Sequence, residues 1–68
     1  MEKYYLNRIA QSTGEHEVHK DGCFRMPDIQ NRIYLGYFSD GKEAVREATK
    51  YFYNVDGCYY CCNEAHKK

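Results

Sequence analysis

The apolar positions of this chain gather in segments whose spacing predicts strands and one helix. Residues 4–10 are rich in aromatic and branched side chains, which is typical of a β-strand. Ile33–Phe38 is almost continuously apolar, which favours a central strand, and Gly36 within it indicates a β-bulge or a close approach of another backbone segment. Residues 15–20 are polar except for Val18, so this segment is expected to pair with the first strand as an exposed hairpin arm.

A helical pattern runs from Gly41 to about Tyr53. Asp40, with Glu43 three residues later, resembles a capping box and predicts where the helix begins; Ser39 is the alternative cap. At 100° per residue, one face of this helix collects the apolar side chains of Ala44, Val45, Ala48, Tyr51 and Phe52.

Turn-forming residues separate these elements. Asp21-Gly22 is a strong turn signal, and Asp56-Gly57 is expected to end the helical region. The sequence therefore predicts one α+β domain over residues 1–68, a small antiparallel sheet of about three strands with one main helix packed on it. Lys67 and Lys68 are expected to form a frayed tail.

The composition indicates that the fold needs support beyond its core. A chain of 68 residues buries only about 60% of the surface of its unfolded form, so its core is marginal. The formal net charge of zero argues against nonspecific wrapping of nucleic acid. No secretory signal and no apolar segment long enough to span a bilayer is seen, so, if the chain is complete, we expect a cytoplasmic protein without a membrane partner.

Two short clusters have the spacing of metal ligands: His19-x3-Cys23 and Cys58-x2-Cys61. Together they offer one imidazole and three thiols, the ligand set of a structural zinc site. The Asp21-Gly22 turn folds the chain back between His19 and Cys23, so one zinc ion is expected to join the two ends of the fold. Structural zinc contributes about 10–16 kcal/mol in zinc-finger peptides, more than a core of this size supplies.

Other donors leave alternatives open. Cys62 is the alternate to Cys61 as the fourth ligand, and His66 and His16 are further alternates that we expect to be exposed. The cysteines could instead be small buried hydrophobic residues without metal. They could also form disulfides in an extracytoplasmic domain, although the adjacent Cys61 and Cys62 cannot easily bridge one another.

The candidate ligands and the elements around them follow one order along the chain: an N-terminal strand, His19-x3-Cys23, Asn31 with Tyr34, a helix carrying Ala44 and Ala48, and Gly57-Cys58-x2-Cys61. Over roughly Tyr4 to Cys62 this order resembles the metal-binding module of the Ada DNA-repair family, related copies of which are appended to nucleases. The resemblance implies a zinc-binding fold and a role on DNA. In that family the first ligand is a cysteine that accepts a methyl group. His19 stands there in this chain, and a zinc-bound neutral imidazole is not the thiolate nucleophile that methyl transfer needs.

The function expected from these features is non-enzymatic. Four protein ligands leave zinc no open position for water, so we predict no catalytic residue. A basic stripe on the helix, Lys42, Arg46 and Lys50, could contact nucleic acid, although Glu43 and Glu47 beside it are typical of an ordinary mixed-charge surface. The preferred interpretation is a zinc-stabilised binding or accessory module for a protein or nucleic-acid partner; the alternative is a nucleic-acid-binding module of the Ada-like type.

Overall fold

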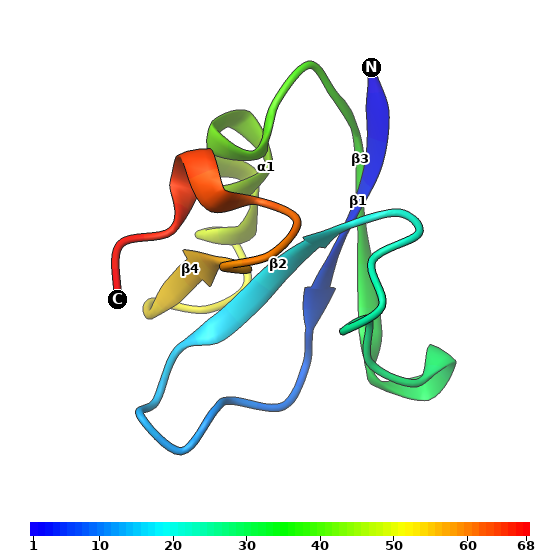
Figure 1. The fold of residues 1–68 in the computed structure, drawn as a ribbon. Coiled ribbons are helices and arrows are strands. Elements are labelled where there is room, and N and C mark those ends of the chain that lie inside the picture. The colour runs from blue at the N-terminus through cyan, green and yellow to red at the C-terminus, as the bar shows by residue number, and fades with distance from the viewer.

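The computed structural model describes residues 1–68 as one helix packed on a four-stranded mixed sheet (Figure 1). The sheet has the order β3-β1-β2-β4, in which β1 runs antiparallel to β2 and β3, and β4 runs parallel to β2. The elements are β1 (Glu2–Asn7), β2 (His16–Lys20), β3 (Arg32–Phe38), α1 (Gly41–Ala48) and β4 (Val55–Gly57), with 3-10 turns at Ile29–Asn31 and Asn63–Ala65. The predicted α+β class is confirmed. The helix is neither long nor apolar enough to cross a membrane.

The fourth strand is the main departure from the predicted sheet. Val55–Gly57 pairs in parallel with β2, with Gly57 opposite Val18, where the sequence predicts a turn. The sheet is therefore mixed and has four strands, one more than the roughly three antiparallel strands predicted, because β4 joins it in parallel. A strand this short exists because its partner supplies the hydrogen bonds, which no local pattern reveals.

The apolar strand β3 lies at the edge of the sheet, so the prediction of a central strand is wrong. Its Tyr34 and Tyr37 side chains are about half exposed, and the Tyr34 ring packs 5.3 Å from that of Tyr5. The predicted bulge is confirmed: the register of β1 against β3 shifts where Tyr4 faces Gly36 and Tyr5 faces Tyr34. The φ of Gly36 is 128°, a conformation that side chains disfavour.

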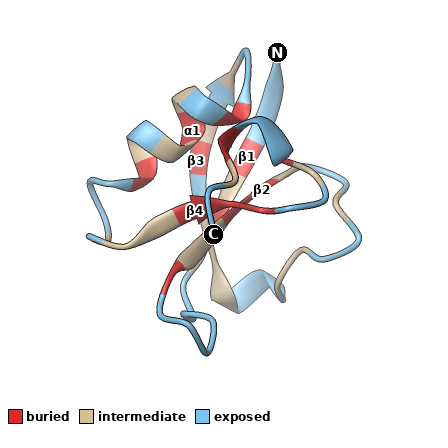
Figure 2. Ribbon diagram, turned by 60° about the vertical axis from the view of Figure 1, so that its left-hand side comes forward, coloured by how far each residue is buried: buried red, intermediate tan, exposed pale blue.

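The polar strand β2 is central rather than exposed. It pairs with β1 as predicted, but β4 covers its other edge, and Val18 and His19 are both buried (Figure 2). Because side chains alternate along a strand, Val18 joins the core under the helix while His19 and Glu17 share the opposite face. The prediction of an exposed arm is wrong, because this second face is also covered.

The helix begins as predicted and ends early. Asp40 Oδ1 accepts the backbone amide of Glu43 at 3.1 Å, which confirms the cap. The Glu43 carboxylate reaches back to Ser39, whose amide and hydroxyl donate to it at 2.9 and 2.8 Å. The helix ends at Ala48 rather than near Tyr53, and Thr49 follows it with its hydroxyl donating to a carbonyl of the last turn.

The core lies between α1 and the sheet. Ala44 and Ala48 are fully buried, and their small side chains let the helix backbone approach the strands closely. Burial raises the pKa of the Tyr4 hydroxyl to about 12. The core cluster consists of Tyr4, Leu6, Val18, Leu35, Ala44, Ala48 and Cys62 (Figure 2).

The C-terminal segment is held against β4. The backbone amides of Lys67 and Lys68, where the sequence predicts a frayed tail, donate to the buried Asp56 carboxylate at 2.8 and 3.2 Å. A Cβ atom on Gly57 would lie 2.7 Å from the Cys62 carbonyl oxygen and 2.9 Å from the Ala65 Cβ. Glycine is therefore required at position 57 for the last segment to lie directly on β4.

Candidate metal centre

Four side chains from the two predicted clusters meet at one point: His19, Cys23, Cys58 and Cys61. One potential ligand atom from each lies within 4.8 Å of all the others. The Cys23 and Cys58 sulfurs are 4.0 Å apart, and Cys61 Sγ is 3.8 Å from His19 Nδ1. Ligands placed at the corners of a zinc–thiolate tetrahedron would be about 3.5–3.8 Å apart. The cluster is therefore close to the size that a tetrahedral metal ion requires.

The parallel pairing of β2 and β4 brings the two halves of the cluster together. Since Val18 faces Gly57, the next residue along each strand is a candidate ligand, His19 on one and Cys58 on the other. The Cys58 amide donates to the Val18 carbonyl at 2.9 Å and extends this pairing by one step. The strand that sequence reasoning missed is thus the element that aligns the site.

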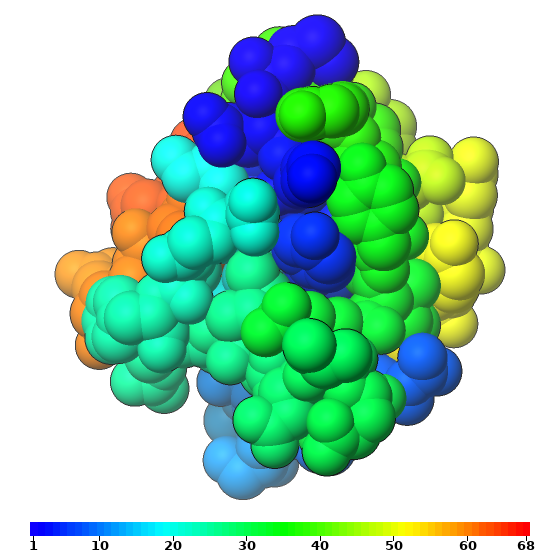
Figure 3. Space-filling view, turned by 90° about the vertical axis from the view of Figure 1, so that its right-hand side faces the viewer, coloured from blue at the N-terminus to red at the C-terminus, as the bar shows by residue number.

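A tight turn returns Cys23 to the cluster. The Cys23 amide donates to the Lys20 carbonyl at 3.1 Å, and the φ of Gly22 is 89°, as at the third position of a type II turn. In the space-filling view of Figure 3, the C-terminal segment around residues 58–61 (orange) lies beside the segment that follows β2 (cyan to teal). Segments about forty residues apart in sequence meet there, as a single metal ion that joins the two ends of the fold requires.

Backbone amides point at the sulfur atoms. The Lys20 amide donates to Cys61 Sγ at 3.2 Å, and the Arg25 amide donates to Cys23 Sγ at 3.4 Å. The Cys62 amide donates to the Cys58 carbonyl at 2.9 Å and closes the turn that carries Cys58 and Cys61. Hydrogen bonds from N–H groups to sulfur favour the thiolate form over the thiol, which is the form that binds a metal.

Without a metal ion, burial favours the uncharged forms of the four side chains of the cluster. It lowers the pKa of His19 to about 4, aided by the nearby Arg25 guanidinium, so the imidazole is neutral at pH 7. Burial raises the pKa of Cys58 to about 12 and also raises that of Cys23. The pKa of Cys61 is raised by its contact with Cys62 and by burial. A coordinated metal reverses the preference of the thiols, because its charge stabilises the thiolates.

Glu17 is a further member of the site that the sequence analysis did not identify. Its Oε1 lies 3.6 Å from His19 Nε2, while Nδ1 of the same ring points toward Cys61. His19 Nε2 is buried and has no hydrogen-bond partner, since 3.6 Å is too long for one. A small shift of the Glu17 carboxylate would complete the carboxylate–histidine–metal arrangement that fixes a ligating imidazole. Glu17 lies two residues before His19 on a predicted strand, and side chains two residues apart share one face of a strand, so this spacing could have indicated Glu17.

None of the alternate ligands belongs to the cluster. Cys62 is fully buried in the core, with its sulfur 4.0 Å from that of Cys61. The His16 ring stacks on Phe52 at 3.6 Å, and its Nδ1 donates to a carbonyl of β1. His66 Nδ1 donates to the Gly57 carbonyl at 2.9 Å. All three are partly or fully buried, so the expectation that the two alternate histidines are exposed is wrong.

All four cysteines are free, so the disulfide-stapled alternative is not what the structure shows. The Cys23–Cys58 and Cys61–Cys62 sulfur pairs are each 4.0 Å apart, whereas a disulfide bond is about 2.05 Å long. The thiols are therefore available to a metal ion.

The predicted basic stripe on α1 is divided. Lys42 and Arg46 line a pocket of about 390 Å³ together with Lys67 from the C-terminal segment. Arg46 also lines a neighbouring pocket together with Lys50, which forms an ion pair with Glu47 at 3.1 Å. The three basic side chains of the predicted stripe therefore line two pockets that share Arg46, and acidic side chains line both pockets as well.

Exposed aromatic side chains lie beside the four-residue cluster, on the two turns that carry its cysteines. Phe24 is 77% exposed and follows Cys23, while Tyr59 and Tyr60 are each 57% exposed and lie between Cys58 and Cys61. The Tyr60 ring contacts those of Phe24 and Tyr59, with centroids 5.1 and 5.2 Å away, and the Arg25 guanidinium lies 5.4 Å above it. The two ligand turns thus carry a continuous aromatic surface.

Comparisons of this chain with protein-family models, curated proteins and solved structures gave no match. The functional conclusions below therefore depend on the geometry of the site itself.

Proposed function

We propose that this protein is a small, non-enzymatic binding module whose fold is stabilised by one zinc ion held by His19, Cys23, Cys58 and Cys61. The observation that carries this proposal is the convergence of the four potential ligand atoms to within 4.8 Å of one another. They come from two ends of a short chain, so a metal ion among them would link β2, β4 and both turns.

The donor set favours zinc among the common metals. Three thiols and one imidazole are soft to borderline ligands, which disfavour magnesium and calcium. Zinc accepts a tetrahedral mixture of sulfur and nitrogen ligands without geometric preferences of its own. The distances of 3.8–4.0 Å between neighbouring donors support a tetrahedral site.

A structural role follows from how completely the chain surrounds the site. Four protein ligands fill a tetrahedron, whereas a catalytic zinc keeps a position for water or substrate. His19 and Cys58 are each only 1% exposed, while Cys23 and Cys61 are half-buried, so the ion would be shielded from solvent on the side of β2 and β4. We therefore propose no catalytic residue in this site.

Binding is the proposed role of the aromatic surface beside the site. Phe24, Tyr59 and Tyr60 are large exposed rings on turns whose conformation the metal would fix. Rigid, exposed aromatic residues are enriched at recognition surfaces. The zinc ion would thus act indirectly, by holding a contact surface in place.

Cobalt substitution tests the metal site and its geometry. Adding Co²⁺ to the metal-free, reduced chain should give the intense visible bands of a tetrahedral ion and sulfur-to-cobalt charge-transfer bands. Added zinc should abolish both. The Cys23→Ser variant should lose part of the charge-transfer intensity, and His16→Gln is the matched control that should not. Weak octahedral bands, or full intensity in Cys23→Ser, would contradict the proposal.

Nucleic-acid binding is a second candidate, favoured by the meeting of Lys42 and Arg46 with Lys67 around one pocket. The resemblance to the Ada metal-binding module supports it. A labelled oligonucleotide should bind with an affinity that falls steeply with salt and falls further in the Lys42→Glu/Arg46→Glu double variant. Lys3→Glu is the control, because Lys3 is exposed on β1 and lines neither pocket of the helix. Binding that does not depend on salt, or no binding, would remove this candidate.

A further inference from the structure

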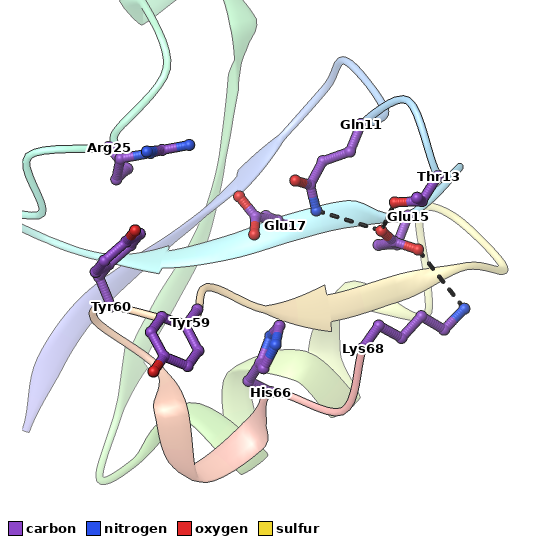
Figure 4. Close-up of a pocket in the computed structure, with 9 residues that line it drawn as sticks. All are labelled: Gln11, Thr13, Glu15, Glu17, Arg25, Tyr59, Tyr60, His66 and Lys68. Atoms are coloured by element: carbon purple, nitrogen blue, oxygen red, sulfur yellow. Dashed lines mark hydrogen bonds and ion pairs between the residues drawn. The ribbon is translucent and has the colours of Figure 1, made fainter.

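A polar cavity lies beside the four candidate metal ligands. It is a cavity of about 500 Å³ lined mostly by polar side chains (Figure 4). Glu15 and Glu17 enter it from the β2 region, Arg25 follows the first ligand turn, and Tyr59 and Tyr60 come from the second. Gln11, Thr13, His66 and Lys68 complete the lining. The cavity thus adjoins the aromatic surface described above.

The Glu15 carboxylate is the unusual feature of this cavity. Glu15 is only 3% exposed, and its Oε1 accepts hydrogen bonds from the Thr13 hydroxyl and the Gln11 amide, the latter at 3.4 Å. Oε2 is buried and has no hydrogen-bond partner. A buried carboxylate normally has both oxygens satisfied by donors or by a cation. One acceptor position in this cavity therefore remains open.

The nearest cation only partly fills that position. Lys68 Nζ lies 3.7 Å from Glu15 Oε2, within ion-pair range but too far for a hydrogen bond. It donates instead to Asn54 Oδ1 at 3.0 Å, and the Lys68 side chain is 53% exposed. A half-exposed ammonium group that makes no hydrogen bond to the carboxylate can be displaced by one that does.

The remaining lining is suited to an organic cation. Glu17 adds a second carboxylate, which is 16% exposed, and the aromatic ring of Tyr59 adds a surface that attracts cations. Arg25 lies over the Tyr60 ring and gives this region a positive charge of its own. The chain has no second group of three converging metal-ligating side chains, so the cavity does not favour a metal ion.

We propose that this cavity binds an alkylammonium group, such as a lysine side chain, which donates to Glu15 Oε2 and displaces Lys68. This inference names a ligand for the binding function proposed above and rests on it. The ammonium would gain a charge-assisted hydrogen bond that Lys68 does not make. The alkyl chain would lie along Tyr59, toward the exposed aromatic surface.

An NMR titration of the zinc-loaded, ¹⁵N-labelled chain tests this proposal. Nα-acetyl-lysine methylamide should cause saturable shifts of the backbone amides of Thr13, Glu15 and Glu17. Its Nε-acetylated form, which lacks the charge, should bind at least about tenfold more weakly. A parallel titration with 1,5-diaminopentane distinguishes the sources: tighter binding of the diamine assigns a free polyamine, and tighter binding of the lysine derivative assigns a peptide. No saturable shift, or equal binding of the neutral form, would overturn the proposal.

Two variants separate the roles of the residues. Glu15→Gln should weaken binding of the lysine derivative by about tenfold or more, because it removes the charge of the acceptor. Lys68→Gln should strengthen binding a few-fold, because it removes the competing ammonium. The exposed Glu2→Gln outside the cavity is the control and should change nothing. If Glu15→Gln does not fold, Lys68→Gln decides: unchanged or weaker binding by that variant overturns the proposal.

The zinc content of each sample separates this proposal from the one before it. Amine binding that is absent while the chain holds one zinc ion contradicts the ammonium site alone. A wild-type chain that folds without zinc contradicts the proposed function itself.

Discussion

The adjacent residues Cys61 and Cys62 offer a sharp test of the metal site, because the structure gives them different roles. Cys61 belongs to the four-residue cluster, whereas Cys62 is fully buried in the apolar core. Replacing either cysteine by alanine removes one sulfur atom, so the two variants differ only in position. Cys61→Ala should lose metal affinity, and Cys62→Ala should keep it.

The expected magnitudes differ enough to be distinguished. If four ligands share about 10–16 kcal/mol of zinc binding equally, losing Cys61 costs about 3–4 kcal/mol, or roughly 10²–10³-fold in affinity. Losing the Cys62 sulfur leaves a cavity about the size of a methyl group, which costs about 1 kcal/mol of folding stability and no metal ligand. The zinc affinity of Cys62→Ala should therefore stay within a few-fold of wild type.

Competition for zinc with a chromophoric chelator measures both affinities, and urea unfolding of the zinc-loaded variants measures their stability. The assignment of Cys61 as the fourth ligand is refuted if the two variants lose zinc affinity equally. It is also refuted if Cys62→Ala loses more than Cys61→Ala, since Cys62 would then be the fourth ligand.

Three further predictions follow from the geometry. Zinc uptake at pH 7 should release about three protons, because three thiols with raised pKa values lose theirs while His19, its pKa lowered to about 4, has none to lose. Zinc affinity should therefore rise with pH, and calorimetry in buffers of different ionisation enthalpy counts the protons; a release near four would show a charged imidazole. Glu17→Gln should weaken zinc binding by about 10–100-fold, measured by chelator competition against Glu2→Gln, and equal affinities would exclude Glu17 as a partner of His19. Gly57→Ala should destabilise the fold by about 1–3 kcal/mol in urea unfolding, because its Cβ would overlap the Cys62 carbonyl; a wild-type midpoint would contradict this close packing.

The parts of the fold set by local patterns could be predicted from the sequence. The Asp40 cap, the turn before Cys23 and the bulge at Gly36 each depend on a few neighbouring residues, and all three are present. The two ligand clusters were likewise visible, because the spacing of metal ligands within a turn is itself local.

The parts of the fold that depend on contacts between distant segments could not be predicted from the sequence. Val55–Gly57 has the residues of a turn, and only its pairing with β2 makes it a strand. The sequence of β2 is polar because its His19 and Glu17 lie at the four-residue cluster. This polarity led to the prediction of an exposed arm. Functional sites are the usual places where residue type and burial disagree.

The edge position of β3 could not be predicted either, because the strand is rich in tyrosine. Its tyrosines gave it the composition of a buried strand, yet Tyr34 and Tyr37 are about half exposed on the edge. A tyrosine has a polar hydroxyl that can remain in water while part of the ring packs, so apolar composition overstates the burial of a strand rich in this residue. The sequence also could not show the open acceptor of Glu15, which depends on where Thr13, Gln11 and Lys68 meet.

Native mass spectrometry of the reduced chain, purified without chelator, tests the central claim most directly. We predict one zinc ion per chain, seen as a mass raised by that of zinc less the two protons that its charge replaces, with loss of the compact charge-state distribution when zinc is removed. A metal-free chain that carries four free thiols and stays folded would contradict the account.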